Sequence, residues 1–233
     1  MKYFYSMLKY AVIVAGGSGN RMNAAIPKQF LPINGTAVLL YTIETFLSAF
    51  SDLEIILVLP EKFMRDGDAI VQQASDPKRI EIAAGGNTRF HSVKNGLKLV
   101  TENAIVFVHD AVRCLVTNDL IHRCYEGALE NGNAIPAIPV SDTVRMETAE
   151  GSVVVDRTKL LVIQTPQTFF SNLLLKAFEQ EYDSSFTDEA TVAEKFGIKI
   201  HLIPGEDENI KLTRPIDMEI AEKILKNRRV SKV

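Results

Sequence analysis

A glycine-rich loop with two cations beside it carries the clearest chemical signal in the sequence. The apolar run 11–14 leads into Ala15-Gly16-Gly17-Ser18-Gly19-Asn20-Arg21-Met22, and Pro27-Lys28-Gln29 follows soon after. Glycine lets backbone N–H groups approach a ligand closely, and a nest of such groups binds phosphate or another anion. Arg21 and Lys28 would bring two positive charges to the same place, so the stretch predicts a nucleoside-triphosphate site. The backbone groups expected there are those of Ala15, Gly16, Gly17 and Gly19.

Three better-known glycine loops do not fit this stretch. A Walker loop needs Lys followed by Ser or Thr after its last glycine, whereas Asn20-Arg21 follows here. The dinucleotide fingerprint and the protein-kinase loop, begun at Gly17, both need a small residue where Met22 lies. From this stretch alone, a β-turn with a surface arginine remains the alternative.

Two further groups of polar residues follow apolar runs. Asp110 comes after 105–108. Its carboxylate suits Mg²⁺ beside phosphates, although it could instead cap the next turn. Arg113 could reach an anion at the same rim or form a surface ion pair. The turn at Gly86-Asn87, with the Ser92 hydroxyl, could read the edge of a base, and Asn87 or Thr88 could equally cap a helix.

Other candidates lie later in the chain, and each has a plainer interpretation. Lys211 precedes the last helical pattern, where a lysine is usually on the surface. Arg157 lies in a segment that breaks the strand–helix rhythm. Thr165 and Thr187 offer hydroxyls at element boundaries, and Thr187 is also a natural helix N-cap.

Composition limits the class of protein. The chain has 233 residues, 46% of them hydrophobic and 24% charged, with a net charge of -3. These values are typical of a globular protein with a sizeable core, and they give no reason to expect a nucleic-acid or membrane partner. Cys114 and Cys124 show no metal-ligand spacing and no signal peptide is recognisable, so we expect a reduced, cytoplasmic protein.

Strand-like runs alternate with helical patterns, which predicts an α/β fold with a mostly parallel, doubly wound sheet. Thr36 is the expected N-cap of a helix that ends near Phe50. Pro136 and Pro139 indicate an edge strand or an irregular exit. The segment 141–161 turns at Glu150-Gly151 and predicts a β-hairpin that leaves the main sheet. The remaining expected strands are 54–59, 79–84, 104–108 and 198–203, and the remaining expected helices are 63–74, 90–100, 117–129, 173–182, 189–196 and one beginning at Pro215.

This architecture restricts where a site can lie. In open α/β sheets, ligands bind outside the carboxyl ends of the strands. Polar residues directly after a strand are therefore stronger candidates than polar residues in the middle of a helix. The first glycine loop, the turn at Gly85-Gly86 and the stretch 110–113 all satisfy this condition.

Taken together, these stretches resemble the 2-C-methyl-D-erythritol 4-phosphate cytidylyltransferase family of the non-mevalonate isoprenoid pathway. The match spans almost the whole chain and keeps the family's order, which makes it far more specific than any single motif. The matching segments are 15–22, 27–29, 85–93, 109–114, 142–143, 155–157, 165–169, 187–190 and 209–215. Gly16 stands where the family usually has alanine, and Val112 and Cys114 replace an alanine and a proline around Arg113.

The resemblance implies a nucleotidyltransferase fold, one catalytic domain over 1–233, and a homodimer joined by a hairpin arm at about 141–161. It implies transfer of CMP from CTP to 2-C-methyl-D-erythritol 4-phosphate with Mg²⁺, releasing pyrophosphate. By this resemblance, Arg21 and Lys28 stabilise the triphosphate, and Arg157 and Lys211 hold the sugar phosphate. Asp110 would serve the metal and the substrate. The cytosine would lie at Gly86, Asn87 and Ser92, and the sugar phosphate beside Arg113, Thr143, Thr165 and Thr187.

The expected chemistry agrees with the residues that the sequence offers. A phosphate oxygen that is already anionic needs no strong general base, so positioning and electrostatics would carry the reaction. Two alternatives remain at this point. One is the related ribitol-5-phosphate cytidylyltransferase, and the other is a non-catalytic nucleotide-binding regulator with the same fold.

Overall fold

The computed structural model describes residues 7–16, 27–101 and 103–230. The strands are β1 (Lys9–Val14), β2 (Pro32–Ile33), β3 (Thr36–Ala37), β4 (Leu53–Leu59), β5 (Ile80–Ala84), β6 (Ile105–Asp110), β7 (Asn133–Pro139), β8 (Val144–Thr148), β9 (Gly151–Val155), β10 (Leu161–Ile163), β11 (Gln167–Phe170) and β12 (Leu202–Pro204). The α-helices are α1 (Val38–Ala49), α2 (Met64–Val71), α3 (Arg89–Leu97), α4 (Asn118–Asn131), α5 (Ser171–Ala177), α6 (Glu189–Lys195) and α7 (Pro215–Val230). Short 3-10 turns are η2 (Lys28–Phe30), η3 (Glu61–Phe63), η4 (Pro77–Arg79) and η5 (Arg157–Lys159).

The central sheet has the order β10-β7-β11-β6-β1-β4-β5, and β12 pairs with β7. β1 runs parallel to β4 and β6, and β4 runs parallel to β5, which confirms the mostly parallel sheet. β11 was not predicted. It lies antiparallel between β6 and β7. Because β7 therefore has neighbours on both sides, its expected position at an edge of the sheet was wrong. Pro136 lies between the residues of β7 that pair with β11 and those that pair with β10. Pro139 is the last residue of β7, where the chain leaves the sheet, so the other expectation, of a strand exit, describes its position.

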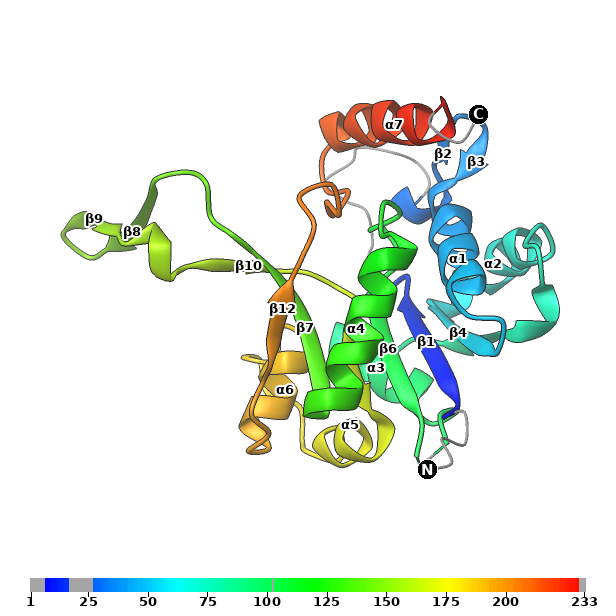
Figure 1. The fold of residues 1–233 in the computed structure, drawn as a ribbon, viewed down its shortest axis with the longest axis horizontal. Helices are drawn as coiled ribbons and strands as arrows, with labels where there is room; N and C mark the ends of the chain where they lie inside the picture. Colours follow the sequence, from blue (N-terminus) through cyan, green and yellow to red (C-terminus); the bar gives the residue numbers. More distant parts are fainter. Residues whose placement is uncertain (1–6, 17–26, 102, 231–233) are drawn as a thin grey trace.

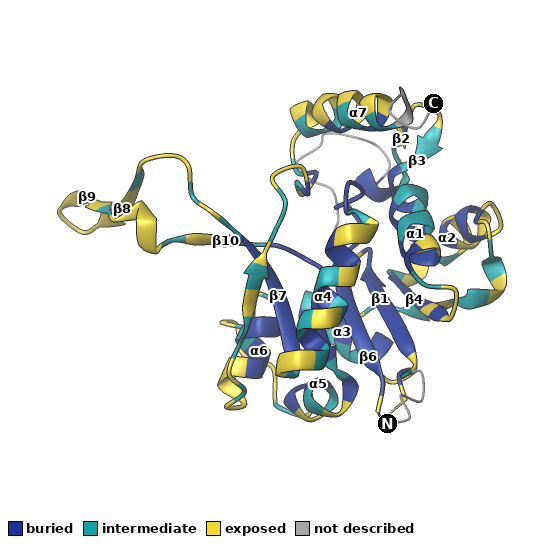
Figure 2. Cartoon of the chain, in the orientation of Figure 1, coloured by how far each residue is buried: buried dark blue, intermediate teal, exposed yellow. Residues whose placement is uncertain are grey.

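Apolar side chains alternate between the two faces of the sheet, and each face is covered by its own helices (Figures 1 and 2). Ala11 and Ile13 of β1 pack with residues of α1 and α4, whereas Val12 and Val14 pack with residues of α3. Both faces of the central strands are buried, as expected for a parallel sheet covered on two sides. The helix layers hold the carboxyl ends of β1, β5 and β6 at one edge.

The packing of α3 on the sheet is unusually close at Gly96. A Cβ placed there would lie 2.8 Å from Cγ1 of Val12 and 2.8 Å from Cγ2 of Val58, which is shorter than carbon atoms tolerate. Glycine therefore lets the helix approach β1 and β4 directly. This contact holds the C-terminal part of α3 against the sheet, and the N-terminus of the same helix lies at the candidate site.

Several local expectations were wrong. Thr36 belongs to β3, and α1 begins after Ala37 without a side-chain cap. Thr187 does not cap α6, because Asp188 does so in a reciprocal capping box with Thr191. The last helix begins at Pro215, as predicted, and its Ile216 and Ile220 side chains are exposed. The residues of α7 that reach the core are Met218, Ala221, Ile224 and Leu225.

The hairpin of β8 and β9 projects away from the sheet, as Figure 1 shows. Residues 141–161, which contain this hairpin, are called the arm. The stem of the arm consists of β7 and β10, which pair antiparallel through Ala137 and Ile163. Figure 2 shows that the residues of the arm are mostly exposed, in contrast to the buried central strands. Among the residues that the structure describes, no helix is long and apolar enough to cross a membrane.

Candidate active site

A pocket opens at the carboxyl ends of three parallel strands. β1 contributes Val14 and the following Ala15 and Gly16, β6 contributes Asp110, and the Gly86-Asn87 turn follows β5. The pocket has a volume of about 280 Å³. Its lining residues are Val14, Ala15, Gly16, Lys28, Gln29, Gly86, Asn87, Thr88, Arg89, Ser92, Asp110, Val112 and Lys211. The sheet therefore brings together residues that lie far apart in the sequence, at the carboxyl ends of its strands, where ligands bind in open α/β sheets.

A shallower recess of about 460 Å³ adjoins this pocket. Both are lined by Gly16, Gly86, Asn87 and Ser92. The recess continues over Pro60, Glu61 and Lys62, which follow β4. The turn at Gly86 lines both hollows. The part of the pocket beside Lys28, Asp110 and Lys211 is called the charged end.

Lys28 lies on η2 at the wall of the pocket. Its side-chain Nζ donates a hydrogen bond to the carbonyl of Leu212 at 2.7 Å, although Lys28 is only 9% exposed. The neighbouring Gln29 amide donates to the carbonyl of Ala15 at 2.6 Å. These two bonds connect the start of the glycine loop and the stretch before α7 to the same turn. The amine of Lys28 is thereby held at the pocket.

Asp110 lies at the centre of the charged end, with cations around its carboxylate. Oδ1 is 3.3 Å from Nε of Arg89, and Oδ2 is 2.9 Å from Nζ of Lys211 and 3.6 Å from Nε of Arg113. Burial alone would raise the pKa of Asp110, but the charges of Arg89, Lys211 and Arg113 outweigh it. They hold the pKa of Asp110 far below its usual value. The carboxylate is therefore ionised at neutral pH.

Arg89 forms a second and closer pair with Glu189. Its Nη1 and Nη2 donate to the two carboxylate oxygens of Glu189 at 2.5 Å and 3.0 Å. Burial would lower the pKa of Arg89, but Glu189 and Asp110 raise it above its usual value. The guanidinium thus bridges two carboxylates, and its charge is not available as a free cation in the pocket. Sequence reasoning missed both residues, although Arg89 and Glu189 lie inside matched segments.

The turn at Gly86 is closed by the Ser92 hydroxyl. Gly86 N–H donates to Oγ of Ser92 at 3.1 Å, and that hydroxyl donates to the carbonyl of Thr88 at 2.9 Å. Thr88 caps α3 by accepting from the N–H of His91 at 3.3 Å. A Cβ at Gly16 would lie 3.6 Å from the same hydroxyl, an ordinary contact. The site would therefore hold alanine at this position, as the matched family usually does.

Arg113 and Thr165 lie behind the pocket rather than in its lining. Arg113 is 8% exposed and donates through Nη1 to the carbonyl of Asn209 at 2.7 Å. Val112 and Cys114 on either side of it are buried in an apolar cluster with Leu212. These two departures from the family pattern are therefore accommodated by packing. Arg113 still reaches Asp110 with its Nε.

The Thr165 hydroxyl is held between two groups of β6. It accepts from the N–H of Asp110 at 3.1 Å and lies 3.0 Å from Nδ1 of His109, while Nε2 of His109 lies 3.2 Å from the carbonyl of Arg113. Burial lowers the pKa of His109 to about 3. In a neutral histidine whose Nε2–H donates to this carbonyl, Nδ1 accepts a hydrogen bond from the Thr165 hydroxyl. Thr165 thus supports the backbone that carries Asp110.

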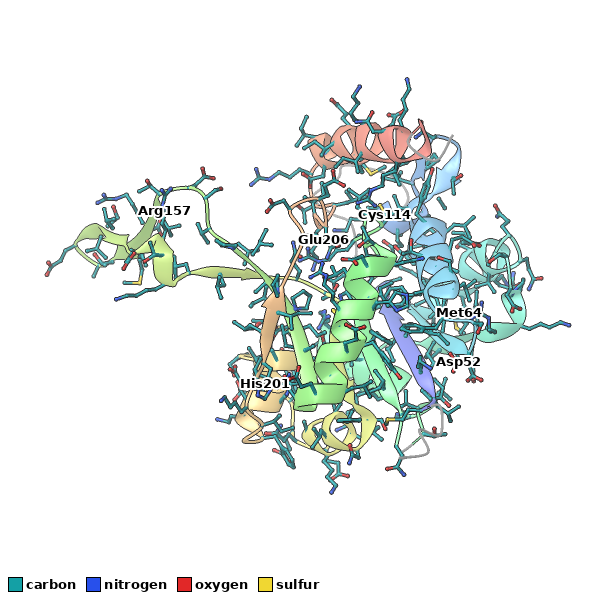
Figure 3. All side chains as sticks on the ribbon, viewed as in Figure 1. Asp52, Met64, Cys114, Arg157, His201 and Glu206 are labelled. Carbon is teal, nitrogen blue, oxygen red and sulfur yellow. The ribbon has the colours of Figure 1, made fainter. Side chains whose placement is uncertain are left out.

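The arm and the segment before α6 place three predicted residues outside the pocket. Thr143 and Arg157 are exposed on the arm, and Figure 3 shows Arg157 well away from the sheet. The Arg157 guanidinium donates to the carbonyl of Ser141 within the arm. Thr187 is exposed just before α6. The remaining predicted residues, Gly17, Gly19 and Arg21, lie outside the described residues.

A divalent metal has one acidic side chain in the pocket lining to bind to. Within the described ranges, no cluster of three or more His, Cys, Asp or Glu side chains could hold an ion by itself. Mg²⁺ commonly binds one or two protein carboxylates and takes its remaining ligands from phosphates and water. Asp110 fits such a role, because each carboxylate oxygen has two lone pairs and can bind an ion beside the cation that it already contacts. The pocket therefore fits a metal that arrives with a phosphate ligand.

Comparisons with known proteins agree with the predicted family. A sequence model of the family described as IspD, 2-C-methyl-D-erythritol 4-phosphate cytidylyltransferase, matches residues 9–227. The protein of that name from Phocaeicola vulgatus is 46% identical over 219 residues, covering 94% of this chain and 100% of the relative. That from Bacteroides thetaiotaomicron is 44% identical over 219 residues, with the same coverage.

A solved structure is also similar. The crystal structure of 4-diphosphocytidyl-2C-methyl-D-erythritol synthase from Anaerococcus prevotii superimposes with a TM-score of 0.79 at 28% identity, covering 94% of this chain and 96% of that one. Sequence and fold thus point to the same group of proteins over nearly the whole chain. The chain belongs to the 2-C-methyl-D-erythritol 4-phosphate cytidylyltransferase family.

Proposed function

We propose that this protein transfers CMP from CTP to 2-C-methyl-D-erythritol 4-phosphate. The products are 4-diphosphocytidyl-2-C-methyl-D-erythritol and pyrophosphate, in the synthesis of isoprenoid precursors. The observation that carries the proposal is the convergence of Lys28, Lys211 and Asp110 with the Gly86 turn around one pocket. The family match supports the same reaction. It does not favour the ribitol-5-phosphate enzyme, which the sequence motifs alone had left open.

CTP lies along the two adjoining hollows in this proposal. The cytosine lies against the turn of Gly86 and Asn87 with Ser92, where backbone groups can bind the edge of a base. The triphosphate points to the charged end. There Lys28 and Arg21 neutralise its charge, and the backbone of Ala15, Gly16, Gly17 and Gly19 binds phosphate oxygens. The described part of this set already lines the pocket.

The polyol phosphate enters beside Lys211. Lys211 is paired with Asp110 at 2.9 Å, and 42% of its side chain is exposed, so its ammonium group can keep this contact and direct another N–H to a phosphate oxygen. Asp110 lies on this side, and Arg113 and Thr165 support it from behind the lining. Thr187 lies outside the pocket in the single chain and is proposed to contact the acceptor only in the complex. An arginine grips phosphate through a fork of donors, which is the role proposed for Arg157.

Arg157 and Thr143 reach a pocket only from the arm of a second copy in this proposal. The register of the arm places Val144, Met146, Val153 and Val155 on one face of the hairpin. Met146 is 57% exposed and Val153 is 46% exposed in the single chain. An isolated two-stranded hairpin is marginally stable in water, so an apolar face of this kind favours packing against a partner. We therefore propose a homodimer in which each arm completes the partner's site.

Mg²⁺ accompanies the triphosphate in this proposal, and Asp110 is the protein ligand. When bound, the ion neutralises charge that develops on the phosphates. The reaction itself is an in-line displacement. An oxygen of the polyol phosphate attacks the α-phosphorus of CTP, the bond to the bridging oxygen breaks, and pyrophosphate leaves with those electrons. Because the nucleophile is already anionic, the site needs no general base.

Among the described residues that line the pocket, none is a histidine, cysteine or tyrosine that could act as a general base, which suits this reaction. His109, the nearest imidazole to Asp110 in sequence, is fully buried and committed to Thr165 and the Arg113 carbonyl. Cys114 and Cys124 are free and buried, and burial raises the pKa of each thiol to about 12. Neither thiol is a nucleophile at neutral pH. We expect such a protein to work in the reducing cytoplasm.

A pyrophosphate-release assay tests the proposal directly. The purified protein is offered CTP, UTP, ATP or GTP with Mg²⁺, each with methylerythritol phosphate, ribitol 5-phosphate or no acceptor. Release is expected only from CTP with methylerythritol phosphate. Preferred turnover of ribitol 5-phosphate would replace the acceptor, and the absence of release with every pair would indicate a nucleotide-binding regulator.

A further inference from the structure

The bridging contact of Arg89 has no place in the proposed reaction. Arg89 is the first residue of α3, directly after the turn proposed to hold the cytosine. Two of its nitrogens bind Glu189 and the third, Nε, points to Oδ1 of Asp110 at 3.3 Å. The guanidinium is planar and rigid, so the bidentate pair with Glu189 fixes the direction of Nε. The orientation of Asp110 then depends on a residue of α6.

Glu189 is itself held firmly. It is 1% exposed and is the first residue of α6, whose N-cap is Asp188. The amide of Gln167 on β11 donates to Oδ2 of Asp188 at 2.8 Å and accepts from the N–H of Ala190 at 2.8 Å. The start of α6 is thus attached to the centre of the sheet by side-chain hydrogen bonds. Glu189 provides a fixed point beneath the charged end of the pocket.

The carboxylate of Asp110 passes this constraint to Lys211. With Oδ1 directed to Arg89, Oδ2 faces Nζ of Lys211 at 2.9 Å. Nζ of Lys211 is therefore placed through a series of ion pairs that begins at Glu189. Glu189 also neutralises Arg89, so that the cationic excess beside Asp110 stays with the exposed amine of Lys211. Neither Arg89 nor Glu189 has to contact a substrate in order to position Lys211.

We propose that Arg89 and Glu189 act as a pair of positioning residues that set the orientation of Asp110 and, through it, of Lys211 toward the acceptor phosphate. This inference rests on the proposed function for its kinetic consequence. Neither residue is a catalytic residue in this account, since each acts through Asp110. The pair serves the acceptor side of the reaction and leaves CTP binding to Lys28, the glycine loop and the Gly86 turn.

The test compares Glu189→Gln and Arg89→Lys with Asp52→Asn in the full-length protein. Glutamine keeps the shape of Glu189 but loses its charge, and lysine keeps the charge of Arg89 but cannot hold both carboxylates. Asp52→Asn is a matched amide replacement in the ion pair with Lys9, 2.8 Å long, at the opposite end of β1. Steady-state kinetics, calorimetric binding of the α,β-methylene analogue of CTP and thermal unfolding are measured for each variant.

We expect Glu189→Gln and Arg89→Lys each to lower kcat about tenfold or more, because misplaced charged groups lose transition-state stabilisation. The KM for the acceptor should rise, whereas the Kd of the CTP analogue stays within about twofold of the wild-type value. Asp52→Asn should leave all three constants unchanged. If the pair had a purely structural role, the variants would unfold at a lower temperature without a larger change in the KM for the acceptor than in the Kd of the CTP analogue. That result would overturn the proposal.

Two further measurements keep the proposal testable. The double variant Arg89→Met with Glu189→Gln leaves no unpaired buried charge, so it folds even if a single variant does not. Its kcat should match that of Glu189→Gln, because both lose the same anchor of Asp110. Independently of catalysis, the NMR signal of ¹³C-methylated Lys211, assigned with Lys211→Arg, should shift in Glu189→Gln and not in Asp52→Asn. A signal that does not move refutes the positioning role, whereas an inactive wild-type protein refutes only the proposed function.

Discussion

The amine of Lys211 lies 2.9 Å from Oδ2 of Asp110, so the last strand–helix junction is attached to the end of β6 at the candidate site. Lys28 reaches the same junction from the other side, through its 2.7 Å hydrogen bond to the carbonyl of Leu212. Two cations from opposite ends of the chain thereby line the pocket that also contains Asp110. This arrangement suits a site that must hold two phosphate-bearing molecules together.

Lys28→Ala should lose transition-state stabilisation of about 3 kcal/mol, which corresponds to a fall in kcat/KM for CTP of more than about a hundredfold. Lys28 lines the pocket at the start of the glycine loop, where the triphosphate is proposed to bind. Lys98→Ala, at an exposed position at the far end of α3, is the control and should retain full activity. Steady-state kinetics provide the measurement, and a change below about tenfold in Lys28→Ala would remove Lys28 from its role.

Lys211→Gln should act on the acceptor rather than on the nucleotide. The substitution removes one of the cations around Asp110 and leaves Arg89 and Arg113 in contact with that carboxylate, so the fold should persist. We expect the KM for methylerythritol phosphate to rise about tenfold or more while the KM for CTP changes little. Lys195→Gln, exposed at the end of α6, is the matched control. The opposite pattern, with CTP affected more, would exclude Lys211 as the acceptor cation.

Arg157→Ala should be complemented by Lys28→Ala when the two inactive variants are unfolded and refolded together. In a mixed dimer, the intact pocket of the Arg157→Ala chain receives the intact arm of the Lys28→Ala chain. Random pairing would restore about a quarter of wild-type activity, because half of the dimers have one complete site. Each variant refolded alone is the control. Activity that stays at the level of the single variants would show that Arg157 does not act across the dimer.

Acid should destabilise the protein through His109. Burial lowers its pKa from 6.5 to about 3, so the unfolded state binds a proton that the folded state does not bind between these pH values. Stability is therefore complete above pH 6.5 and falls as the pH decreases toward 3. Between pH 7 and pH 5 we expect a loss of about 2 kcal/mol in the free energy of unfolding.

Urea unfolding of His109→Gln provides the comparison for this pH effect. The variant should show a smaller loss between the same two pH values, whereas His122→Gln, at an exposed position on α4, should behave like the wild-type protein. Equal pH dependence in all three proteins would contradict the assignment to His109.

The edge of the sheet that holds the site could be predicted from the sequence, but the details of the site could not. β1, β4 and β6 contain continuous apolar runs, and those of β1 and β6 are followed by the glycine-rich loop and by His109-Asp110. Periodicity, together with the rule that ligands bind at the carboxyl ends of strands, therefore located Ala15 and Asp110. The prediction that Thr36 caps a helix was wrong because β2 and β3 are only two residues long. Such short strands leave no pattern in the sequence from which their pairing could be predicted. Local patterns carry no information about such a partner.

β11 and the Arg89–Glu189 pair were missed for a related reason. The strand is four residues long, and its antiparallel partners β6 and β7 come earlier in the chain. Arg89 and Glu189 each resemble an ordinary charged residue in the first turn of a helix, and their 2.5 Å contact exists only after α3 and α6 have docked. Interactions between distant segments thus decide which matched residues contact a ligand and which support those that do.

The position of β11 also bears on how the chain matures on the ribosome. Since β11 fills the space between β6 and β7, a nascent chain that ends before residue 167 has both flanking strands but nothing to join them. Their unpaired backbone edges would then be open to association with other chains. Catalytic competence and protection against aggregation should therefore appear together, late in translation.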